Sequence, residues 1–477
     1  MFIGKIYLKL LLLPIVTATL LLFGCSPKVG NGSIVISSIS SNTSLTNFRN
    51  IEDRYDNLSG SLVAIDPENL TRQPIELTAD FFSAAAPDIS DDGKKIVFTA
   101  RSEEKGRWQI WEMELANLKK RVVTPAEFDA VDPVYLPGER IAFTMITKSD
   151  LIKSESALYV CNIDGSGLYR ITFAPHSYYS SSILADGRIV SLSRKVFPEN
   201  GNQELLVMRP DGTKAELFYL PGKGNTLLGG VREASQGMIY MIESPSDSSS
   251  GGNIISVKYN RPLHSRTELT SEDASDYISV MPYMDEKLLV SCKKSTDENY
   301  SLYIYNTESN SLGEQIISLP GKNITGALAV SKATRPKKLP SEVDYGVKTG
   351  LLLVQNISIS GMVSPEELRS MNIADRIEIA GVDSSMGSVK PAADGSVYLK
   401  IVADKPFRLT TYDSNGKVIY GPGSWLYLRP NERRGCVGCH SDPEITPANR
   451  YSLAVGIDPV SVPVNMKIIK EKEVELE

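Results

Sequence analysis

Short apolar strands preceded by polar turns recur at regular intervals through the middle of the chain. The first copy spans residues 86–99, where the turn Asp91-Asp92-Gly93 leads into the apolar run Ile96-Val97-Phe98. Repeats of about 40–50 residues with several strands each are typical of β-propellers. The turn positions of the successive copies lie 45 to 50 residues apart: Gly93, Gly138, Gly187, Gly237 and Asp285.

A second, outer hairpin with strand-like apolar runs follows each of these inner ones. One further outer hairpin, residues 61–65 with 74–77, stands before the first inner copy and needs a partner. Strands near residues 325–330 would supply it, because a sheet shared by both ends of the chain leaves no exposed edge. The pattern predicts a mainly β fold, with a propeller of about six blades over residues 58–340.

The sequence pattern changes at the charged, proline-rich linker 335–340. Beyond it, residues 351–354 form an apolar, strand-like run, and residues 407–420 alternate apolar and polar positions around Asn415-Gly416. The second pattern is the signature of an antiparallel hairpin. We expect a small β-sandwich over residues 341–428.

The first 25 residues have the organisation of an export signal. A short segment with two lysines precedes the apolar run 10–23, which ends in Gly24 followed by Cys25. This order is that of a lipoprotein signal, in which the cysteine takes the lipid. A membrane-spanning helix is the alternative, but the run is shorter than the ~20 residues that crossing a bilayer requires. We expect lipidation at Cys25, and Ser26 favours the outer membrane of the cell envelope, on its periplasmic or surface side.

Residues 26–57 are rich in serine, threonine and asparagine, with Ile34-Val35-Ile36 as the one apolar patch. A polar composition of this kind is typical of flexible linkers. We therefore expect a polar tether between the lipid anchor and the propeller.

Composition narrows the classes of function. The net charge is −6 with interspersed signs, and no basic stripe is present, which argues against nucleic-acid binding. Five cysteines are too few for a disulfide scaffold in a chain of 477 residues. Cys161 and Cys292 lie in strand-like runs, where buried thiols packing as small hydrophobes are expected.

The chemistry is concentrated in Cys436-Val437-Gly438-Cys439-His440. Cys-x-x-Cys-His is the attachment signature of c-type haem: two thiols add to the two vinyl groups, and the adjacent imidazole reaches the iron. We expect one covalent haem c in a segment over residues 429–477, bound by Cys436 and Cys439 with His440 as iron ligand. Two alternatives are half of a zinc site and a redox-active disulfide.

Only 37 residues follow His440, too few for a separate cytochrome fold. The haem must therefore pack against the sandwich, a propeller face or a partner. The side chains considered as second iron ligand are Met466, His176 and His264.

Two resemblances follow from these motifs. Residues 347–454, above all 425–444, resemble the middle domain of the hydrazine synthase alpha subunit and its relatives. The resemblance implies covalent haem at Cys436 and Cys439, with His440 in the place of the motif's ligand. Hydrazine synthesis itself is not implied, since that family's synthase uses more than one haem and partner subunits. The Pro-Asp-Ile-Ser-Asp-Asp-Gly-Lys form of the first repeat resembles TolB-like propellers.

Two classes of function remain. The first is electron transfer or haem redox chemistry at the cell envelope, with a protein redox partner or another envelope protein. The second is a binding or scaffold protein, in which the propeller grips its partner and the haem or metal is structural. Paired acidic residues sit in turn, loop or helix contexts typical of solvated faces, so an enzymatic activity is not assigned.

Overall fold

The computed structural model describes residues 28–44, 51–56, 58–147, 155–248, 251–271, 274–359, 374–438, 444 and 451–464. Four residues singled out by the sequence lie outside these ranges: Cys25, Cys439, His440 and Met466. Within the described ranges the fold is mainly β, as predicted. The helices described there are short: α1 (Ile51–Asp56) and two 3-10 turns, Ser235–Gly237 and Leu453–Gly456.

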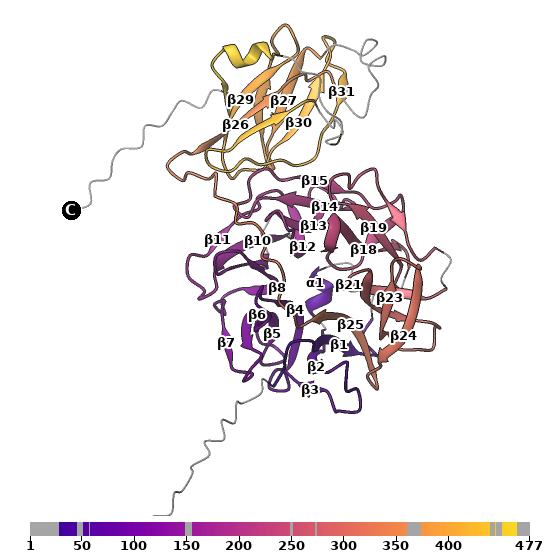
Figure 1. The fold of residues 1–477 in the computed structure, drawn as a ribbon. Coiled ribbons are helices and arrows are strands. Elements are labelled where there is room, and N and C mark those ends of the chain that lie inside the picture. Colours follow the sequence, from indigo (N-terminus) through magenta and orange to yellow (C-terminus); the bar gives the residue numbers. More distant parts are fainter. Residues whose placement is uncertain are drawn as a thin grey trace, which may run out of the picture.

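The first part of the chain is a β-propeller, whose sheets follow one another around α1 (Figure 1). One sheet has the order β4 (Ser83–Ile89), β5 (Lys95–Arg101), β6 (Gln109–Glu114) and β7 (Lys120–Val122). The next holds β8 (Asp129–Leu136), β9 (Arg140–Thr147), β10 (Glu155–Asn162), β11 (Tyr169–Arg170), β12 (His176–Ile183), β13 (Ile189–Lys195), β14 (Gln203–Met208) and β15 (Glu216–Tyr219).

Two further sheets continue the ring. One contains β16 (Asn225–Leu227), β17 (Arg232–Glu233), β18 (Met238–Pro245), β19 (Asn253–Lys258) and β20 (Thr267–Glu268). The other contains β21 (Asp276–Met284), β22 (Lys287–Lys293), β23 (Ser301–Asn306) and β24 (Ser311–Ile317).

The ring is closed by a sheet that joins the two ends of the propeller. Its order is β25 (Lys322–Ala329), β1 (Ile34–Ser40), β2 (Gly60–Ile65) and β3 (Ile75–Glu76). Both ends of the propeller therefore meet in one sheet, but β2 pairs with β1 rather than directly with β25.

The expectation of a polar tether over residues 26–57 is wrong. Strand β1 is buried along almost its whole length, and its serines are satisfied inside the sheet. Ser38 is fully buried, and its hydroxyl lies 3.2 Å from that of Ser61. Helix α1 likewise buries Tyr55 in the central core. A serine-rich run is polar by composition, yet hydrogen bonding makes it compatible with a buried strand.

The repeat predicted from the turn positions is present. Gly93, Gly138 and Gly187 have φ of 69°, 88° and 89°, a conformation that favours glycine. The chain between β25 and the second unit runs along these turns: Lys337 donates its backbone N–H to Ala185 O, 3.0 Å away. A Cβ at Gly187 would lie 2.0 Å from the Lys337 carbonyl oxygen. Because they lack a side chain, the repeat glycines therefore also allow the linker to pack directly against these turns.

Buried side chains fill the space between the sheets in several clusters. Cys161 and Cys292 are buried thiols in β10 and β22, which confirms the prediction for both. Burial raises the pKa of Cys161 to about 12, so this thiol stays neutral at physiological pH.

The second unit consists of two four-stranded sheets around one core. The first has the order β32 (Arg433–Cys436), β26 (Thr349–Val354), β29 (Val397–Val402) and β33 (Val460–Val462). The second has the order β28 (Ser385–Val389), β27 (Arg376–Ala380), β30 (Arg408–Tyr412) and β31 (Val418–Tyr420). Since β32 and β33 complete the first sheet, the described part of residues 429–477 belongs to this unit and is not a separate segment.

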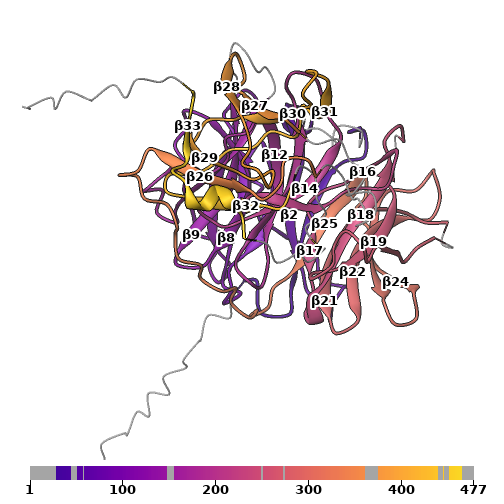
Figure 2. The ribbon, with the colours of Figure 1, turned by 90° about the horizontal axis from the view of Figure 1, so that it is seen from above.

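The second unit sits on the propeller next to the sheet that holds β8 to β15 (Figure 1), and Figure 2 shows the molecule from above. Trp425 and Tyr427 share a buried cluster with propeller residues such as Leu158 and Met208. Because these aromatic side chains are almost fully buried, the two parts pack against each other through an apolar contact.

Candidate functional site

The described half of the Cys-x-x-Cys-His motif is held at the edge of a sheet. Strand β32 is an edge strand that runs parallel to β26, with Cys436 opposite Val354. The pairing continues past the strand, because Gln355 N donates to Cys436 O over 2.8 Å and Asn356 N donates to Val437 O over 3.1 Å. The main chain is therefore fixed up to the residue after the first cysteine.

The surroundings of Cys436 and Gly438 are tight. The Cys436 side chain is half-buried against the core of the second unit and forms no disulfide with another described cysteine. Burial raises the pKa of its thiol, and Arg434 opposes that rise. A Cβ at Gly438 would lie 2.5 Å from Cβ of Ile359, so a larger residue in this place would displace its neighbour.

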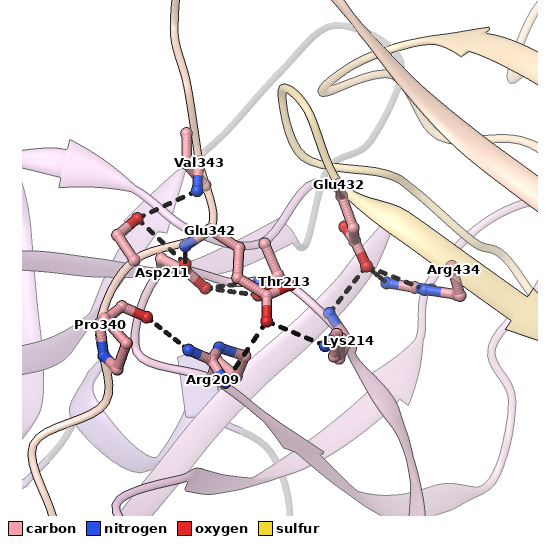
Figure 3. Close-up of polar contacts among 10 residues, drawn as sticks. Arg209, Asp211, Thr213, Lys214, Pro340, Glu342, Val343, Glu432 and Arg434 are labelled. Carbon is pink, nitrogen blue, oxygen red and sulfur yellow. Dashed lines mark hydrogen bonds and ion pairs between the residues drawn. The ribbon is translucent and has the colours of Figure 1, made fainter.

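A buried carboxylate anchors the segment that leads into the motif. The Glu432 side chain is fully buried, and its Oε1 accepts a hydrogen bond from Lys214 N of the propeller over 2.8 Å (Figure 3). The same oxygen accepts from Nε and Nη2 of Arg434, over 3.0 and 2.6 Å. Oε2 accepts from the backbone N–H of Arg429 over 2.8 Å. Such hydrogen bonds compensate the cost of burying a charge.

Arg429 also joins the second unit to the propeller, here as the donor of a hydrogen bond. Its side chain is 1 % exposed and donates from Nε to Asp211 O over 3.0 Å. Its Nη1 pairs with Asp404 Oδ1 at 2.7 Å, and the guanidinium carbon lies 4.7 Å from the ring centre of Phe173. Arg429 therefore bridges two parts of the chain that are distant in sequence.

The linker is fastened to the same propeller hairpin (Figure 3). Asp211 Oδ2 accepts from the hydroxyl of Ser341 over 3.0 Å and from Glu342 N over 2.7 Å. Burial acts to raise the pKa of Asp211, but hydrogen bonds, from Thr213 first, lower it overall, so the residue stays ionised. Glu342 in turn pairs with Lys214 Nζ at 2.9 Å.

Comparison with known proteins identifies the second unit and the fold. The family model of the hydrazine synthase alpha subunit middle domain matches residues 363–441. Hydrazine synthase subunit alpha of Kuenenia stuttgartiensis is 21% identical over 501 residues, which cover 78% of this chain and 61% of the relative. The solved structure of Kuenenia stuttgartiensis hydrazine synthase has a TM-score of 0.75 at 17% identity, over 90% of this chain and 72% of that one.

The chain is related to the hydrazine synthase alpha subunit. This confirms the resemblance expected from residues 347–454. This chain spans about three fifths of the length of the curated subunit that it matches. TolB from Acinetobacter baumannii has a TM-score of 0.42 at 16% identity, over 60% of this chain and 65% of that one.

The two histidines considered as second iron ligand have different surroundings in this chain. His176 in β12 is buried, its Nδ1 lies 2.7 Å from the Ser193 hydroxyl, and burial lowers its pKa to about 4. His264 belongs to the loop between β19 and β20, where the adjacent Leu263 N donates to Glu444 Oε1 over 2.5 Å. Glu444 lies four positions after His440, so this loop contacts the chain shortly after the motif.

Within the described ranges, no three His, Cys, Asp or Glu side chains gather closely enough to hold a metal ion, and Cys439 and His440 are not among those residues. No helix among the described residues is long and apolar enough to cross a membrane.

The docking role of residues 425–434 was not anticipated from the sequence. These residues carry the family resemblance, and the sequence divides them only between the expected β-sandwich and the expected haem segment. A signal was present, since charged Arg429 and Glu432 follow the apolar, aromatic run Trp425-Leu426-Tyr427-Leu428. Charged residues are almost never fully buried unless they are paired, so burial of this stretch would require a partner for each of the two. Their propeller partners, Asp211 for Arg429 and Lys214 for Glu432, each lie 218 positions away, and no local pattern identifies them.

Proposed function

We propose that this chain is an exported, lipid-anchored protein that carries one c-type haem and transfers electrons or performs haem redox chemistry at the cell envelope. Cys436 and Cys439 would hold the haem covalently, and His440 would ligate the iron. The observation that carries the proposal is the Cys-x-x-Cys-His motif at residues 436–440, within the range matched by the hydrazine synthase alpha middle domain. The chain is proposed as a relative of that synthase and not as a hydrazine-forming enzyme.

The described residues fit the proposed group. Cys436 lies at the end of an edge strand, and its side chain is half-buried. A thioether bond requires one accessible sulfur at a fixed backbone position, and the hydrogen bonds of Gln355 and Asn356 supply that position. When bound, the haem supplies an iron that changes oxidation state.

The surrounding residues would position this site relative to the propeller. The carboxylate of Glu432 binds the guanidinium of Arg434 just before Cys436. Arg429 and Glu432 join the same stretch to the hairpin at Asp211 and Lys214. The chain's contribution is a rigid attachment of the haem-bearing strand, which a redox centre needs in order to present one face to its partner.

Covalent haem attachment is tested on the full chain expressed in the periplasm with haem maturation factors. We expect a mass increase of one haem and a haem-stained band that survives denaturation. Cys436→Ala with Cys439→Ala should abolish both, whereas Cys161→Ala, a buried thiol in the propeller, should leave both unchanged. A matured protein that holds zinc or a Cys436–Cys439 disulfide, with no haem, would contradict the proposal.

The proposed anchor is tested separately. If Cys25 carries the lipid, Cys25→Ala should release the protein from membranes or leave an uncleaved precursor. Wild-type protein that is fully soluble and has no lipid mass would contradict an anchor while leaving the haem proposal intact.

A binding or scaffold function of the propeller is the second candidate, and the cavity described below favours it. We interpret the eight-stranded sheet as two blades joined by the single Ser156–Ser177 pairing, which gives six blades, and the second unit as a β-sandwich.

Redox potential together with carbon monoxide binding separates electron transfer from the binding or scaffold function. A reversible potential within the range of known redox partners supports electron transfer, and a haem that does not cycle supports the scaffold.

A further inference from the structure

A cavity of about 180 Å³ lies inside the propeller, in the centre of the ring. Helix α1 contributes Arg54 and Tyr55 to its wall, and Figure 1 shows this helix in the middle of the ring. The remaining wall comes from successive sheets, including Asp132 of β8, Ser181 of β12 and Arg232 of β17. The cavity lies in the propeller and not at the proposed haem segment, so its function is independent of the haem.

Strained backbone shapes this cavity. The strands β4, β8 and β12 each shift register at one point, and the irregular residues face the centre. At these points Ala86, Asp132 and Ser180 have φ of 49°, 52° and 49°. A residue with a side chain pays roughly 1–2 kcal/mol for this conformation. Strain repeated around one cavity is typical of functional sites.

One of the two arginines in the wall is already neutralised. Arg54 Nη1 lies 3.6 Å from Asp132 Oδ2 and 3.0 Å from the Ser180 hydroxyl. The Asp132 carboxylate also accepts from the Tyr55 hydroxyl and from Ser180 N. These contacts pair Arg54 with a carboxylate and hold α1 against β8 and β12.

The second arginine lacks such a partner. Within the described residues, no carboxylate lies within ion-pair distance of Arg232, whose Nη1 donates to Val231 O over 2.9 Å. Burial lowers the pKa of Arg232, and Asp88 and Asp132 act on it only at longer range. Burial also raises the pKa of Asp88 to about 6, which weakens this compensation below that pH. The Arg232 side chain is half-buried, and an incompletely compensated guanidinium in such a place favours binding of an anion.

A hydroxyl without a partner lies beside this arginine. Ser181 is 7 % exposed, and its Oγ has no hydrogen-bond partner among the described residues. A Cβ at Gly230 would lie 2.5 Å from Ser180 O and 3.2 Å from Arg232 Nη1, so the guanidinium is close to the Ser180-Ser181 segment. The guanidinium of Arg232 and the hydroxyl-bearing Ser181 therefore line the same cavity, with Arg232 next to the Ser180 backbone.

The wall also contains apolar side chains, among them Val280, Met281 and Leu328, beside polar residues such as Ser279 and Thr325. A dry cavity of about 150 Å³ is known to hold benzene. The present volume thus suits a ligand with one anionic group and a small apolar body.

We propose that the propeller cavity binds a small monocarboxylate, whose carboxylate pairs with Arg232 and accepts a hydrogen bond from Ser181. Its apolar body contacts Val280 and Met281. Small-molecule sites commonly combine a mainly apolar wall with a few such polar groups.

The probe is benzoate, titrated into the full-length protein by calorimetry, with benzyl alcohol as its neutral counterpart. We expect saturable binding of one benzoate per chain, a rise in the unfolding temperature, and no binding of benzyl alcohol at the same concentrations. Arg232→Gln should weaken benzoate binding at least tenfold. The matched control is Arg72→Gln, which replaces an exposed arginine and should bind as the wild type does.

The apo protein supplies a second readout. Removal of an incompletely compensated charge should leave the unfolding temperature of Arg232→Gln equal to or above that of the wild type. If the variant does not fold, Ser181→Ala decides in its place, with an expected loss of about threefold to tenfold in affinity. Equal binding of benzyl alcohol, unchanged affinity in these variants, or no saturable benzoate binding at millimolar concentration would overturn the proposal.

Discussion

The backbone N–H of Lys214 donates to the carboxylate of Glu432 over 2.8 Å, although 218 positions separate the two residues. This hydrogen bond joins a propeller hairpin to the segment that precedes the cysteine motif. The carboxylate is fully buried and accepts from Arg429 and Arg434 as well. The position of the motif therefore depends on one buried charge.

Glu432→Ala should destabilise the protein by about 3–5 kcal/mol, because it leaves Arg434 and buried donors without their acceptor. The measurement is the free energy of unfolding in urea. Glu127→Ala is the control, since Glu127 is exposed, and should change it by less than about 0.5 kcal/mol. A loss below 1 kcal/mol in Glu432→Ala would show that the contact does not hold the two parts together.

Two glycines with the same φ test whether the linker packs against the repeat turn at Gly187. Gly187 and Gly32 both have φ of 89°, but only Gly187 would bring a Cβ against the Lys337 carbonyl, and Gly32 has nothing within 4 Å. Both alanine variants suffer the backbone strain. Gly187→Ala should lose about 1–3 kcal/mol more, because the linker must move. Equal unfolding temperatures for the two variants would contradict this account.

Stability should depend on pH through Glu204. Burial raises the pKa of this carboxyl from its ordinary 4.5 to about 7 in the folded protein. The folded state therefore retains a proton that the unfolded state releases, and wild-type stability falls as the pH rises from 4.5 to 7. Glu204→Gln cannot titrate. Its stability relative to the wild type should rise through this window, by up to about 3 kcal/mol, and level off above pH 7. Urea unfolding at pH 5 and pH 8 measures the difference, and a constant difference would contradict the assignment.

Ring closure is tested by comparing chains that begin at residue 28 and at residue 45. The shorter chain lacks β1, so β2 and β25 lose their shared partner and expose unpaired edges. We expect the longer chain to unfold in a cooperative transition and the shorter one to aggregate or lose that transition. A wild-type-like melt of the shorter chain would mean that β1 is dispensable for closure.

The second iron ligand is examined in haem-loaded protein. Of the side chains considered, His264 is expected to affect the iron, because its loop contacts Glu444 beyond the motif. His264→Ala should alter the absorbance of the reduced protein and increase carbon monoxide binding. His176→Gln is the matched control and should leave the spectrum unchanged, because His176 is enclosed in β12. The reverse pattern would exclude His264.

Local patterns predicted the parts of the fold that local chemistry determines. The repeat glycines have the positive φ that tight turns require, and Gly416 in the predicted hairpin has φ of 81°. The same patterns failed for β1, because composition cannot distinguish a solvated serine from Ser38, which is hydrogen-bonded inside a sheet. They also missed the pairing of Arg429 with Asp211, since a contact between distant residues leaves no local periodicity.

The sheet that closes the ring determines how late in synthesis its strands can pair. Thr325 Oγ1 donates to Ser37 O, 288 positions earlier, so β1 meets its partner only when nearly the whole propeller has been made. At ordinary synthesis rates of about 5–20 residues per second, this wait lasts roughly 15–60 s. During that interval β1 has an unsatisfied edge toward the missing strand. Folding of the ring is therefore expected to be completed after synthesis, as a slow final step with high contact order.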